Sequence, residues 1–353
     1  MDFTKTILFW YYDNKKDFPW RLTKDPYKIW ISEIMLQQTQ VNTVIPFYQN
    51  WIKKFPTVYD VADASDEVLF KYWEGLGYYN RVNNFRAACN EIIEFNNGVI
   101  PQTKLELMNL KGIGDYTSSA IASIAFKKKH YAIDGNVKRI MARVLCLKDF
   151  SKLSFNKMDN FLSNNIDSKN PGDFNQALMD LGREVCKAKK PLCESCPISS
   201  ICRAYLMGKT KNYPVMNKKK SKPPHYTIGV GVIWRNNKIL ITKRKKNVLL
   251  GGLWEFPGGK KIKKESITNC IKREILEELS INVDVSNFII KVNHKYSHFG
   301  ITLHAHHCFY KTGDIICNSA DDWKWIRPNQ LAQFPFPKAN HYIFPYILNQ
   351  KVA

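Results

Sequence analysis

The sequence lacks the long apolar segments that membrane proteins need and the leader that exported proteins carry. Its first residues contain no basic stretch followed by an apolar core. No later apolar run approaches the roughly 20 residues that a membrane span requires. Internal repeats are also missing, and the one biased stretch is rich in lysine. We therefore expect a cytoplasmic protein without a signal peptide, and we exclude membrane and repeat architectures.

Acidic residues are scarce relative to basic ones. Among 353 residues, 53 are Lys or Arg and 31 are Asp or Glu, which gives a net charge of +22. Such a surface attracts polyanions, because it binds phosphates and releases their counterions. Nucleic acid is the leading candidate partner, but a plainly solvated basic surface would produce the same charge. The motifs must decide between the two.

The larger part of the chain has the pattern of an all-helical domain. In residues 1–208, apolar side chains recur at three- and four-residue spacing, with breaks such as Asn97-Gly98 and Pro171-Gly172. Residues 209–225 combine prolines with a lysine run and have little apolar content, which is typical of an exposed connector. We therefore predict a helical domain over 1–208 and a basic connector over 209–225.

The remainder of the chain, residues 226–353, is predicted to form an α+β domain. β-Branched runs span 226–234 and 238–244, and Asn236-Asn237 between them fits a hairpin turn. A helical stretch follows over residues 265–279. The sequence thus predicts a multidomain protein whose two domains differ in class.

The nine cysteines are unevenly distributed. Four of them are Cys186, Cys193, Cys196 and Cys202, while the other five are scattered. A reducing compartment does not favour a disulfide framework, and four thiolates this close together can converge on one centre. Thiolate chemistry leaves both zinc and an iron–sulfur cluster open. Residues 186–202 are therefore predicted to form a metal-binding loop.

Two carboxylates stand in unusual settings. Glu33 lies among bulky apolar residues of a predicted helix that Asp25-Pro26 opens. Burial there would raise its pKa and let it act as a general acid, whereas an exposed glutamate would be ordinary. Asp134 precedes an amphipathic helix, whose N-terminus stabilises an anion, although a simple capping aspartate would look the same. Both are candidate catalytic groups.

A helical hairpin with two glycines is predicted between these carboxylates in the sequence. Thr103 and Glu106 form a capping-box pattern, and the turn that contains Gly112 and Gly114 leads into a second helix over about 116–125. Exposed amides at the start of that helix can hold a phosphate oxygen, which would position DNA without reading its sequence. A plain turn between two helices would carry the same glycines.

Three stretches resemble the MutY-like adenine DNA glycosylases of the endonuclease III superfamily. They are PWR at 19–21, WISEIMLQQTQV at 30–41 and GLGYYNR at 75–81, and the hairpin and the cysteine loop follow in the expected order. Lys111 departs from the pattern, which commonly has proline there. The resemblance implies a helix-hairpin-helix glycosylase domain over 1–208, with a structural 4Fe-4S cluster held by the four cysteines.

The resemblance also implies a reaction. Such enzymes flip adenine that is paired with 8-oxoguanine, or with guanine, out of duplex DNA and hydrolyse its glycosidic bond in base excision repair. Glu33 would protonate the base and Asp134 would stabilise the oxocarbenium-like sugar. Tyr116 and Asn136 match residues that orient the aspartate and the sugar. Because Tyr116 stands where bifunctional relatives have a Schiff-base lysine, a monofunctional enzyme is expected.

Further positions match residues that contact DNA in the family. Those matched to the adenine pocket are Arg21, Leu36 and Gln176. Those matched to side chains inserted beside the opposing base are Gln38 and Tyr78. In isolation, Leu36 and Tyr78 would be ordinary core residues. The expected partner is double-stranded DNA, bound by a monomer, and replication and repair proteins are further candidates.

A second resemblance covers the C-terminal part. From Gly259 to Ser280 the chain resembles a Nudix box, with a departure at Ser280, where the pattern has glycine. Besides Glu265, the box contains Glu274, Glu277 and Glu278. They fall on one side of a helix and could share Mg²⁺, or they could form an ordinary acidic face. In MutY-like proteins such a domain recognises 8-oxoguanine, and the loop over 294–299 makes Ser297 the expected lesion reader.

Other functions fit parts of the sequence. A bifunctional endonuclease III-like glycosylase for oxidised pyrimidines would share the hairpin and the cluster, but it would have the lysine and no Nudix-like domain. A noncatalytic lesion-binding protein would leave Glu33 and Asp134 inert. A Nudix hydrolase tethered to DNA would explain the last third of the chain and nothing else.

Overall fold

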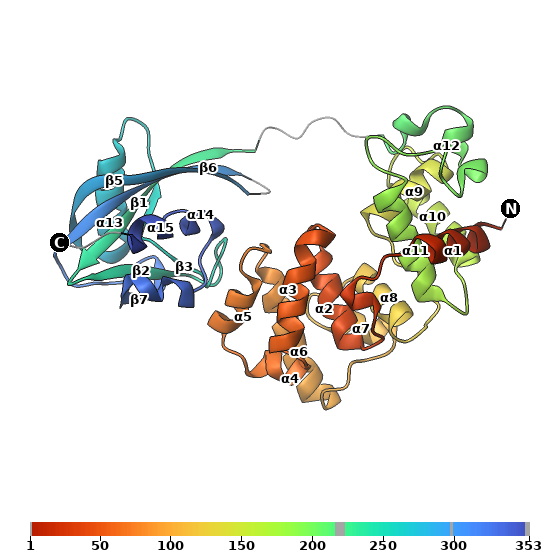
Figure 1. Cartoon of the computed structure of the whole chain (residues 1–353), viewed down its shortest axis with the longest axis horizontal. Coiled ribbons are helices and arrows are strands. Elements are labelled where there is room, and N and C mark those ends of the chain that lie inside the picture. Colours follow the sequence, from red (N-terminus) through yellow and green to blue (C-terminus); the bar gives the residue numbers. More distant parts are fainter. Residues whose placement is uncertain (1, 216–222, 297–298, 350–353) are drawn as a thin grey trace. The chain divides into compact units, whose positions relative to one another are not determined.

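The computed structural model describes residues 2–215, 223–296 and 299–349. Backbone contacts divide the chain into two compact units (Figure 1), which are Met1–Asp63 with Arg81–Lys218, and Ala64–Asn80 with Lys219–Ala353. The first unit is helical and the second is built on a β-sheet, as the sequence predicted. Each unit has a hydrophobic core of its own.

The first unit consists of helices joined by short turns. In chain order these helices are α1 (Phe3–Asn14), α2 (Pro26–Leu36), α3 (Val41–Lys54), α4 (Val58–Asp63), α6 (Asn80–Asn96), α7 (Lys104–Asn109), α8 (Asp115–Ile124), α9 (Gly135–Val144), α10 (Lys152–Asn165), α11 (Pro171–Glu184) and α12 (Arg203–Leu206). Short 3-10 turns are η1 (Pro19–Arg21), η2 (Ser199–Ile201) and η3 (Thr210–Asn212). Within the described part of the chain, no helix has both the length and the apolar character that crossing a membrane requires.

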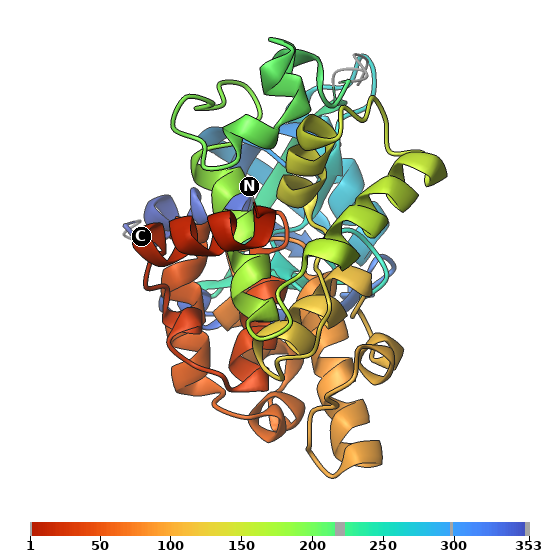
Figure 2. The ribbon, with the colours of Figure 1, turned by 90° about the vertical axis from the view of Figure 1, so that its right-hand side faces the viewer.

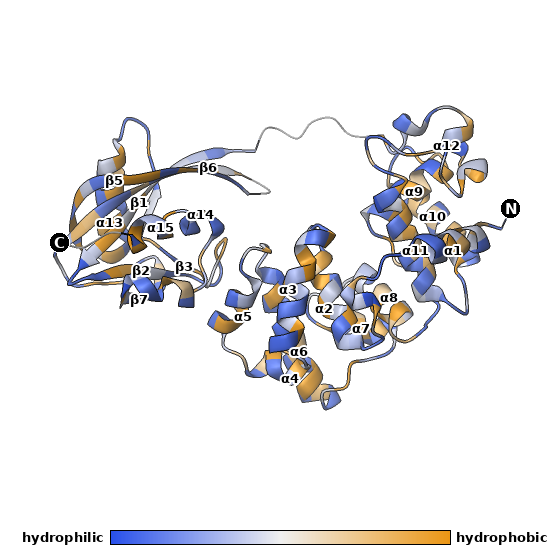
Figure 3. Cartoon of the chain, in the orientation of Figure 1, coloured by the Kyte–Doolittle hydropathy of each residue, from blue (hydrophilic) through white to orange (hydrophobic). Residues whose placement is uncertain are grey.

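Side-chain caps begin several helices of this unit. Asp25 accepts hydrogen bonds from the backbone N–H groups of Tyr27 and Lys28 at the start of α2. Thr103 and Glu106 form the predicted capping box at the start of α7. Figure 3 shows apolar and polar residues on the same helices, so each helix can bury one side and expose another.

The core of the first unit lies around α1, α9 and α11. Ile7 of α1, Val137 and Met141 of α9, and Phe174 and Leu178 of α11 are fully buried together. The helix α1, red, runs beside α11, light green, in Figure 1 and Figure 2. This packing holds the N-terminus of α9 against α11.

The predicted helical hairpin is present, with α7 and α8 packed against each other. Gly112 in the turn has a φ of 78°, and a Cβ there would lie 2.6 Å from the Cβ of Asn84. The backbone angle and the close approach both require glycine. A Cβ at Gly114 would meet nothing within 4 Å, so the space beside the N-terminus of α8 is open.

The second unit is built on a sheet of seven strands, ordered β3-β2-β1-β6-β5, with β4 paired to β1 and β7 paired to β2. The strands are β1 (His225–Arg235), β2 (Lys238–Arg244), β3 (Trp254–Glu255), β4 (Gly258–Lys260), β5 (Asn282–Lys295), β6 (Gly300–Thr312) and β7 (Ala320–Ile326). Its helices are α5 (Asp66–Trp73), α13 (Ile267–Leu279), α14 (Lys338–His341) and α15 (Phe344–Leu348), and a 3-10 turn, η4, spans Pro328–Gln333. β1 and β6 are parallel, and the other pairs are antiparallel.

Helices cover both faces of this sheet. On one face, α13 comes close to β1, because a Cβ at Gly229 would lie 2.9 Å from Ile271 and one at Gly231 would lie 2.8 Å from Ile275. On the opposite face, Ile347 of α15 packs into the core that the sheet forms there. The sheet is therefore buried on both sides around β1.

The predicted hairpin turn lies between β1 and β2. Arg235 pairs with Lys238, and the two residues between them, Asn236 and Asn237, have φ angles of 49° and 58°. Asparagine tolerates this left-handed region better than most residues, which is why the Asn-Asn pair signalled a turn.

Ser280 ends α13 in the left-handed region, with φ 58° and ψ 24°. This conformation explains why the Nudix pattern has glycine at the position. We expect Ser280→Gly to raise the free energy of unfolding of the second unit by about 1 kcal/mol. The gain is limited because Asn318 Nδ2 donates to Ser280 Oγ over 3.2 Å.

Denaturant unfolding followed by tryptophan fluorescence measures the effect, and Ser280→Ala is the matched control. Alanine also loses the hydroxyl but keeps the Cβ, so it should not stabilise the unit. An equal gain from alanine and glycine would show that the backbone angle is not the cause.

Candidate active site and cysteine cluster

Glu33 of α2 is a buried carboxylic acid, with 6% of its surface exposed. Burial raises the pKa of Glu33 to about 7, even though the hydrogen bond from Tyr116 opposes this effect. The charge of Asp134 also raises the pKa of Glu33, and that of Arg21 lowers it. Tyr116 Oη donates to Glu33 Oε2 over 2.7 Å. Near pH 7, Glu33 can therefore carry a proton and also release it.

Asp134 caps the N-terminus of α9. Its Oδ1 accepts from the backbone N–H of Val137 and its Oδ2 accepts from Asn136 Nδ2, each over 2.7 Å. Arg139 Nη2 donates to Asn136 Oδ1 and to the carbonyl of Gly182, each over 2.8 Å. The Asn136 amide is thus oriented so that its nitrogen faces the carboxylate. Arg139 was not among the residues predicted from the sequence, although its place one turn after Asn136 on a predicted helix was an available signal.

Glu33 and Asp134 line one cavity of about 1170 Å³. The other predicted site residues that line it are Arg21, Leu36, Gln38, Tyr116, Asn136 and Gln176. They come from η1, α2, α8, α9 and α11 and from the turn after α2. The helical unit therefore gathers at one cavity the residues matched to catalysis and to the adenine pocket. The cavity is large enough for a nucleoside.

A buried ion pair orients Arg21 in this cavity. Its Nη1 and Nη2 donate to the two carboxylate oxygens of Asp180 over 2.7 and 2.9 Å. The two side chains are 12% and 4% exposed. A bidentate pair of this kind fixes the guanidinium plane. Asp180 was not among the residues predicted from the sequence, although it follows Gln176 by one turn of α11 and so shares its side of the helix.

Four predicted DNA contacts lie outside this group or have no described position. Gly112 and Gly114 lie in the hairpin between α7 and α8. Tyr78 belongs to the second unit and follows α5, with a φ of 51°. Ser297 lies outside the described residues, so its role stays a prediction.

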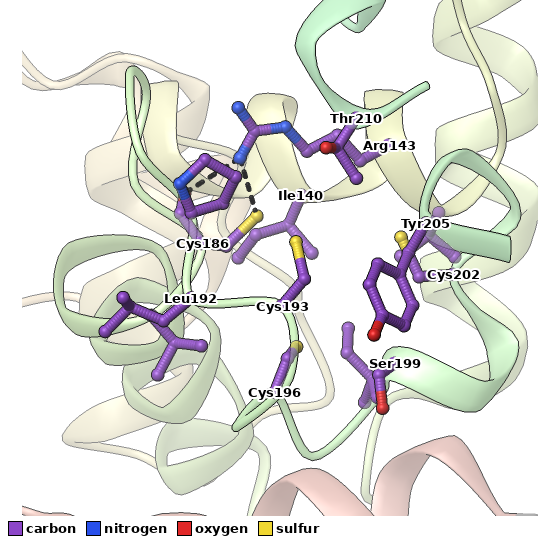
Figure 4. A pocket seen from close by; sticks show the side chains of 14 residues that line it. Ile140, Arg143, Cys186, Leu192, Cys193, Cys196, Ser199, Cys202, Tyr205 and Thr210 are labelled. Carbon is purple, nitrogen blue, oxygen red and sulfur yellow. Dashed lines mark hydrogen bonds between the residues drawn. The ribbon is translucent and has the colours of Figure 1, made fainter. Parts of the chain in front are cut away.

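The clustered cysteines line one pocket together with Arg143 of α9, and Figure 4 shows their side chains. They are Cys186, Cys193, Cys196 and Cys202. Arg143 Nη1 donates to Cys186 Sγ over 3.1 Å. Burial raises the pKa of the Cys196 thiol to about 12, so thiolates here require a compensating positive centre.

The donor set fits an iron–sulfur cluster, because it consists of four sulfurs in one pocket. Among the described residues, no three His, Cys, Asp or Glu side chains are already arranged as a metal site. The fit therefore depends on the chemistry of the thiols and on their shared pocket, both of which suit zinc as well.

Arg273 pairs with two of the three Nudix-box glutamates on α13. Its Nη1 lies 2.8 Å from Glu274 and 3.0 Å from Glu277. Burial and the charge of Glu255 raise the pKa of the third, Glu278, to about 7. Glu274 and Glu277 therefore share one partner, whereas Glu278 Oε2 accepts from the backbone N–H of Gly258 over 3.4 Å.

Three family models match the chain. Residues 31–160 match the HhH-GPD superfamily of base excision DNA repair proteins, residues 186–202 match the iron–sulfur binding domain of endonuclease III, and residues 229–345 match the NUDIX domain. The second match decides between zinc and an iron–sulfur cluster in favour of the latter. Fold and site together define a helix-hairpin-helix base excision repair protein with an iron–sulfur cluster and a Nudix-like domain.

The relatives narrow this class to one family. An adenine DNA glycosylase from Buchnera aphidicola subsp. Acyrthosiphon pisum is 35% identical over 303 residues, which cover 84% of this chain and 83% of the relative. One from Arabidopsis thaliana is 37% identical over 299 residues, which cover 71% of this chain and 46% of the relative. The chain belongs to the adenine DNA glycosylase family, as its motifs predicted. It spans about half the length of the plant relative.

A solved structure supports the fold of the first unit. The structure of a thermostable thymine-DNA glycosylase is 29% identical, with a TM-score of 0.54, and the match covers 58% of this chain and 95% of that chain. The chain therefore shares a fold with that glycosylase over 58% of its length.

Proposed function

We propose that this protein is a monofunctional DNA glycosylase that removes adenine paired with 8-oxoguanine, or with guanine, from duplex DNA. One observation carries the proposal: a buried acid with a pKa of about 7, Glu33, and a carboxylate at a helix N-terminus, Asp134, line the same cavity. Hydrolysis of a glycosidic bond needs one group that donates a proton and another that stabilises positive charge. Membership of the adenine DNA glycosylase family supports adenine as the base.

Glu33 is the proton donor in this proposal. Its Oε2 accepts the hydrogen bond from Tyr116, so Oε1 is the atom that carries the proton. Transfer of that proton to N7 of adenine makes the base a better leaving group. The acid is reprotonated readily at neutral pH because its pKa is about 7.

Asp134 stabilises the sugar as the base leaves. Both of its oxygens accept hydrogen bonds, from Val137 N and Asn136 Nδ2, which hold the carboxylate in one orientation. Its negative charge opposes the positive charge on the oxocarbenium-like sugar, electrostatically or through a transient covalent bond. Water then completes the hydrolysis.

The flipped base enters the cavity beside Arg21, Leu36 and Gln176. Arg21 is held by Asp180, so its remaining N–H groups have a defined direction. Gln176 is 6% exposed and adds a carboxamide at the wall of the cavity. These polar groups would bind the edge of adenine, and Leu36 would contact its face.

The partner in this proposal is double-stranded DNA, bound by a monomer. The net charge of +22 favours it, and the open N-terminus of α8 next to Gly114 offers backbone amides to a phosphate. Gln38 and Tyr78 would enter the base stack beside the opposing base, and Ser297 would contact 8-oxoguanine. The iron–sulfur cluster, of the 4Fe-4S type, would hold the loop at 186–202 in shape.

Single-turnover base release tests the proposal, with adenine placed opposite 8-oxoguanine, guanine or thymine. We expect release to be fastest opposite 8-oxoguanine, and strand scission to need added alkali, because Tyr116 supplies no amine for a Schiff base. Scission without alkali would indicate a bifunctional enzyme. No release by a cluster-loaded protein that still binds DNA would identify a noncatalytic lesion binder.

A second activity, hydrolysis of an oxidised purine nucleoside triphosphate, is proposed for the Nudix-like unit. It is favoured by a pocket of about 590 Å³ that has aromatic walls, including Tyr226 and Phe256, and Glu278 at one side. Asn340 lines it and is 6% exposed, and its Nδ2 has no hydrogen-bond partner among the described residues. Such a pocket suits a nucleobase next to a carboxylate cluster.

Mg²⁺ would be held by Glu274, Glu277 and Glu278, where it would neutralise charge on the phosphates. We expect pyrophosphate release from 8-oxo-dGTP in the presence of Mg²⁺, at least about tenfold slower after Glu277→Gln. The control is Glu94→Gln, which changes an exposed glutamate of the other unit. No turnover at high protein concentration would reject this activity and leave adenine removal unaffected.

A further inference from the structure

The residues 64–80, here called the α5 segment, lie between helices of the first unit in sequence but belong to the second unit by their contacts. The segment contains α5 and the turn that carries Tyr78. Charged and aromatic side chains of the α5 segment contact the sheet-containing part of the second unit. These contacts are specific enough to be tested one by one.

Glu74, at the end of α5, is the most densely bonded of these side chains. Its Oε1 accepts from the backbone N–H of Phe336 over 2.6 Å and from His341 Nε2 over 2.8 Å, and its Oε2 accepts from Lys71 Nζ over 2.7 Å. The side chain is 14% exposed. Burial acts to raise the pKa of Glu74, but these hydrogen bonds outweigh it and the pKa is lowered. The carboxylate is therefore charged and paired at neutral pH.

Lys71 extends the same network, since its Nζ also donates to the carbonyl of Phe334 over 3.2 Å. At the other end of α5, Glu67 Oε1 accepts from Lys243 Nζ over 3.1 Å and from Trp254 Nε1 over 3.2 Å. Trp254 is fully buried in the sheet. Two carboxylates, one at each end of α5, thus connect the helix to the sheet-containing part of the unit.

An apolar contact lies between Glu67 and Glu74 along α5. Phe70 of α5 is 3% exposed, and a Cβ at Gly252 would lie 2.5 Å from its ring. Phe70 also packs edge-to-face against Tyr79, with ring centroids 5.5 Å apart. The glycine allows the aromatic side chain to come this close. The segment is therefore packed as well as bonded.

The turn after α5 transmits this placement to Tyr78. Trp73 Nε1 donates to the carbonyl of Gly77 over 3.0 Å, and Leu76 N donates to the carbonyl of Trp73 over 3.1 Å. Tyr78 has a φ of 51°, which a non-glycine residue adopts when its surroundings impose it. A shift of α5 would therefore shift Tyr78.

We propose that Glu74, supported by Glu67, is a positioning residue for Tyr78, so that the Nudix-like part of the chain sets how Tyr78 meets the base opposite adenine. The inference rests on the proposed removal of adenine opposite 8-oxoguanine. In this arrangement Tyr78, which enters the base stack, belongs to the same unit as the loop predicted to contact 8-oxoguanine. Discrimination between 8-oxoguanine and guanine then depends on contacts far from Glu33 and Asp134.

A double-mutant cycle tests the coupling, with the preference for 8-oxoguanine over guanine as readout. The preference is the ratio of single-turnover rate constants for adenine opposite each base, at subsaturating and at saturating enzyme. We expect Glu74→Ala and Tyr78→Leu each to lower it about tenfold, and the double variant to lower it no further than Tyr78→Leu alone. Glu74→Gln keeps an acceptor for Phe336 N and should restore part of the preference.

The matched control is Glu94→Gln, which should leave the preference unchanged. If Glu74→Ala lowers the melting temperature too far, His341→Ala removes one partner of Glu74 and takes its place in the cycle. Losses that add in the double variant, or an unchanged preference in Glu74→Ala, would overturn the inference. A wild-type protein that releases no adenine would instead contradict the proposed function itself.

Discussion

Replacing Glu33 by glutamine is expected to slow adenine release about a thousandfold. Glutamine keeps the size of the side chain and an acceptor for Tyr116 Oη, which lies 2.7 Å from Glu33 Oε2, but it has no acidic proton. The loss therefore comes from the chemistry and not from the packing of α2. Single-turnover excision from a duplex with adenine opposite 8-oxoguanine measures it. Release within tenfold of the wild-type rate would mean that another group protonates the base.

The pH dependence of adenine excision also tests whether Glu33 is the proton donor. Because the pKa of Glu33 is raised to about 7, the excision rate should fall as the pH rises above 7. Stability changes with the same sign, since a carboxyl whose pKa is raised from 4.5 stabilises the fold at low pH and loses that contribution as the pH rises through about 7. In Glu33→Gln the pH dependence of the excision rate should disappear, and that of stability should become smaller, because Glu278 also has a pKa raised to about 7.

Tyr116→Phe provides a second test of whether Glu33 causes the pH dependence of excision. The hydrogen bond from Tyr116 lowers the pKa of Glu33, so its removal should move the descending limb of the rate profile to higher pH. A limb near pH 7 that persists in Glu33→Gln would assign it to a different group.

Replacing Asp134 by asparagine is expected to slow adenine release by about a thousandfold as well. Asparagine is as good an N-cap as aspartate, so its carbonyl can still accept from Val137 N and α9 should form. The negative charge is lost, and an amide nitrogen in place of Oδ2 would face the Asn136 nitrogen that now donates to it over 2.7 Å. Charge and orientation are therefore removed together.

Asp2→Asn provides the matched control for Asp134→Asn. Asp2 is the N-cap of α1 and accepts from Lys5 N in the same way, but it is exposed. It should leave excision unchanged. Thermal unfolding and the visible absorbance of the cluster show whether each variant is folded and loaded. A folded, loaded Asp134→Asn protein with normal excision would remove Asp134 from the chemistry.

Local patterns were sufficient to predict some of these features. Apolar neighbours along α2 predicted the burial of Glu33, and that burial is what raises its pKa. The capping box at Thr103 and the Asn236-Asn237 turn could also be predicted, because each depends on residues close in sequence. The cysteine spacing predicted a metal site, but the choice of an iron–sulfur cluster needed the family match.

Contacts between distant residues could not be predicted in this way. Arg21 and Asp180 are separated by most of the helical unit, and no local pattern says that they pair. The same holds for Glu74, whose partner His341 lies near the end of the chain. A carboxylate on a helix looks the same in sequence whether it meets water or a distant cation.

The sequence by itself predicted the class of each domain, the capping box and hairpin turns, a metal-binding loop and the family. These follow from periodicity, from caps and from spacing, which depend on neighbours along the chain. Tertiary structure decided that Glu33 and Asp134 share a cavity, that Arg139 orients Asn136, and that the α5 segment packs with the sheet. The physical reason is that burial, charge pairing and side-chain orientation are properties of the packed chain, and packing joins residues that the sequence separates.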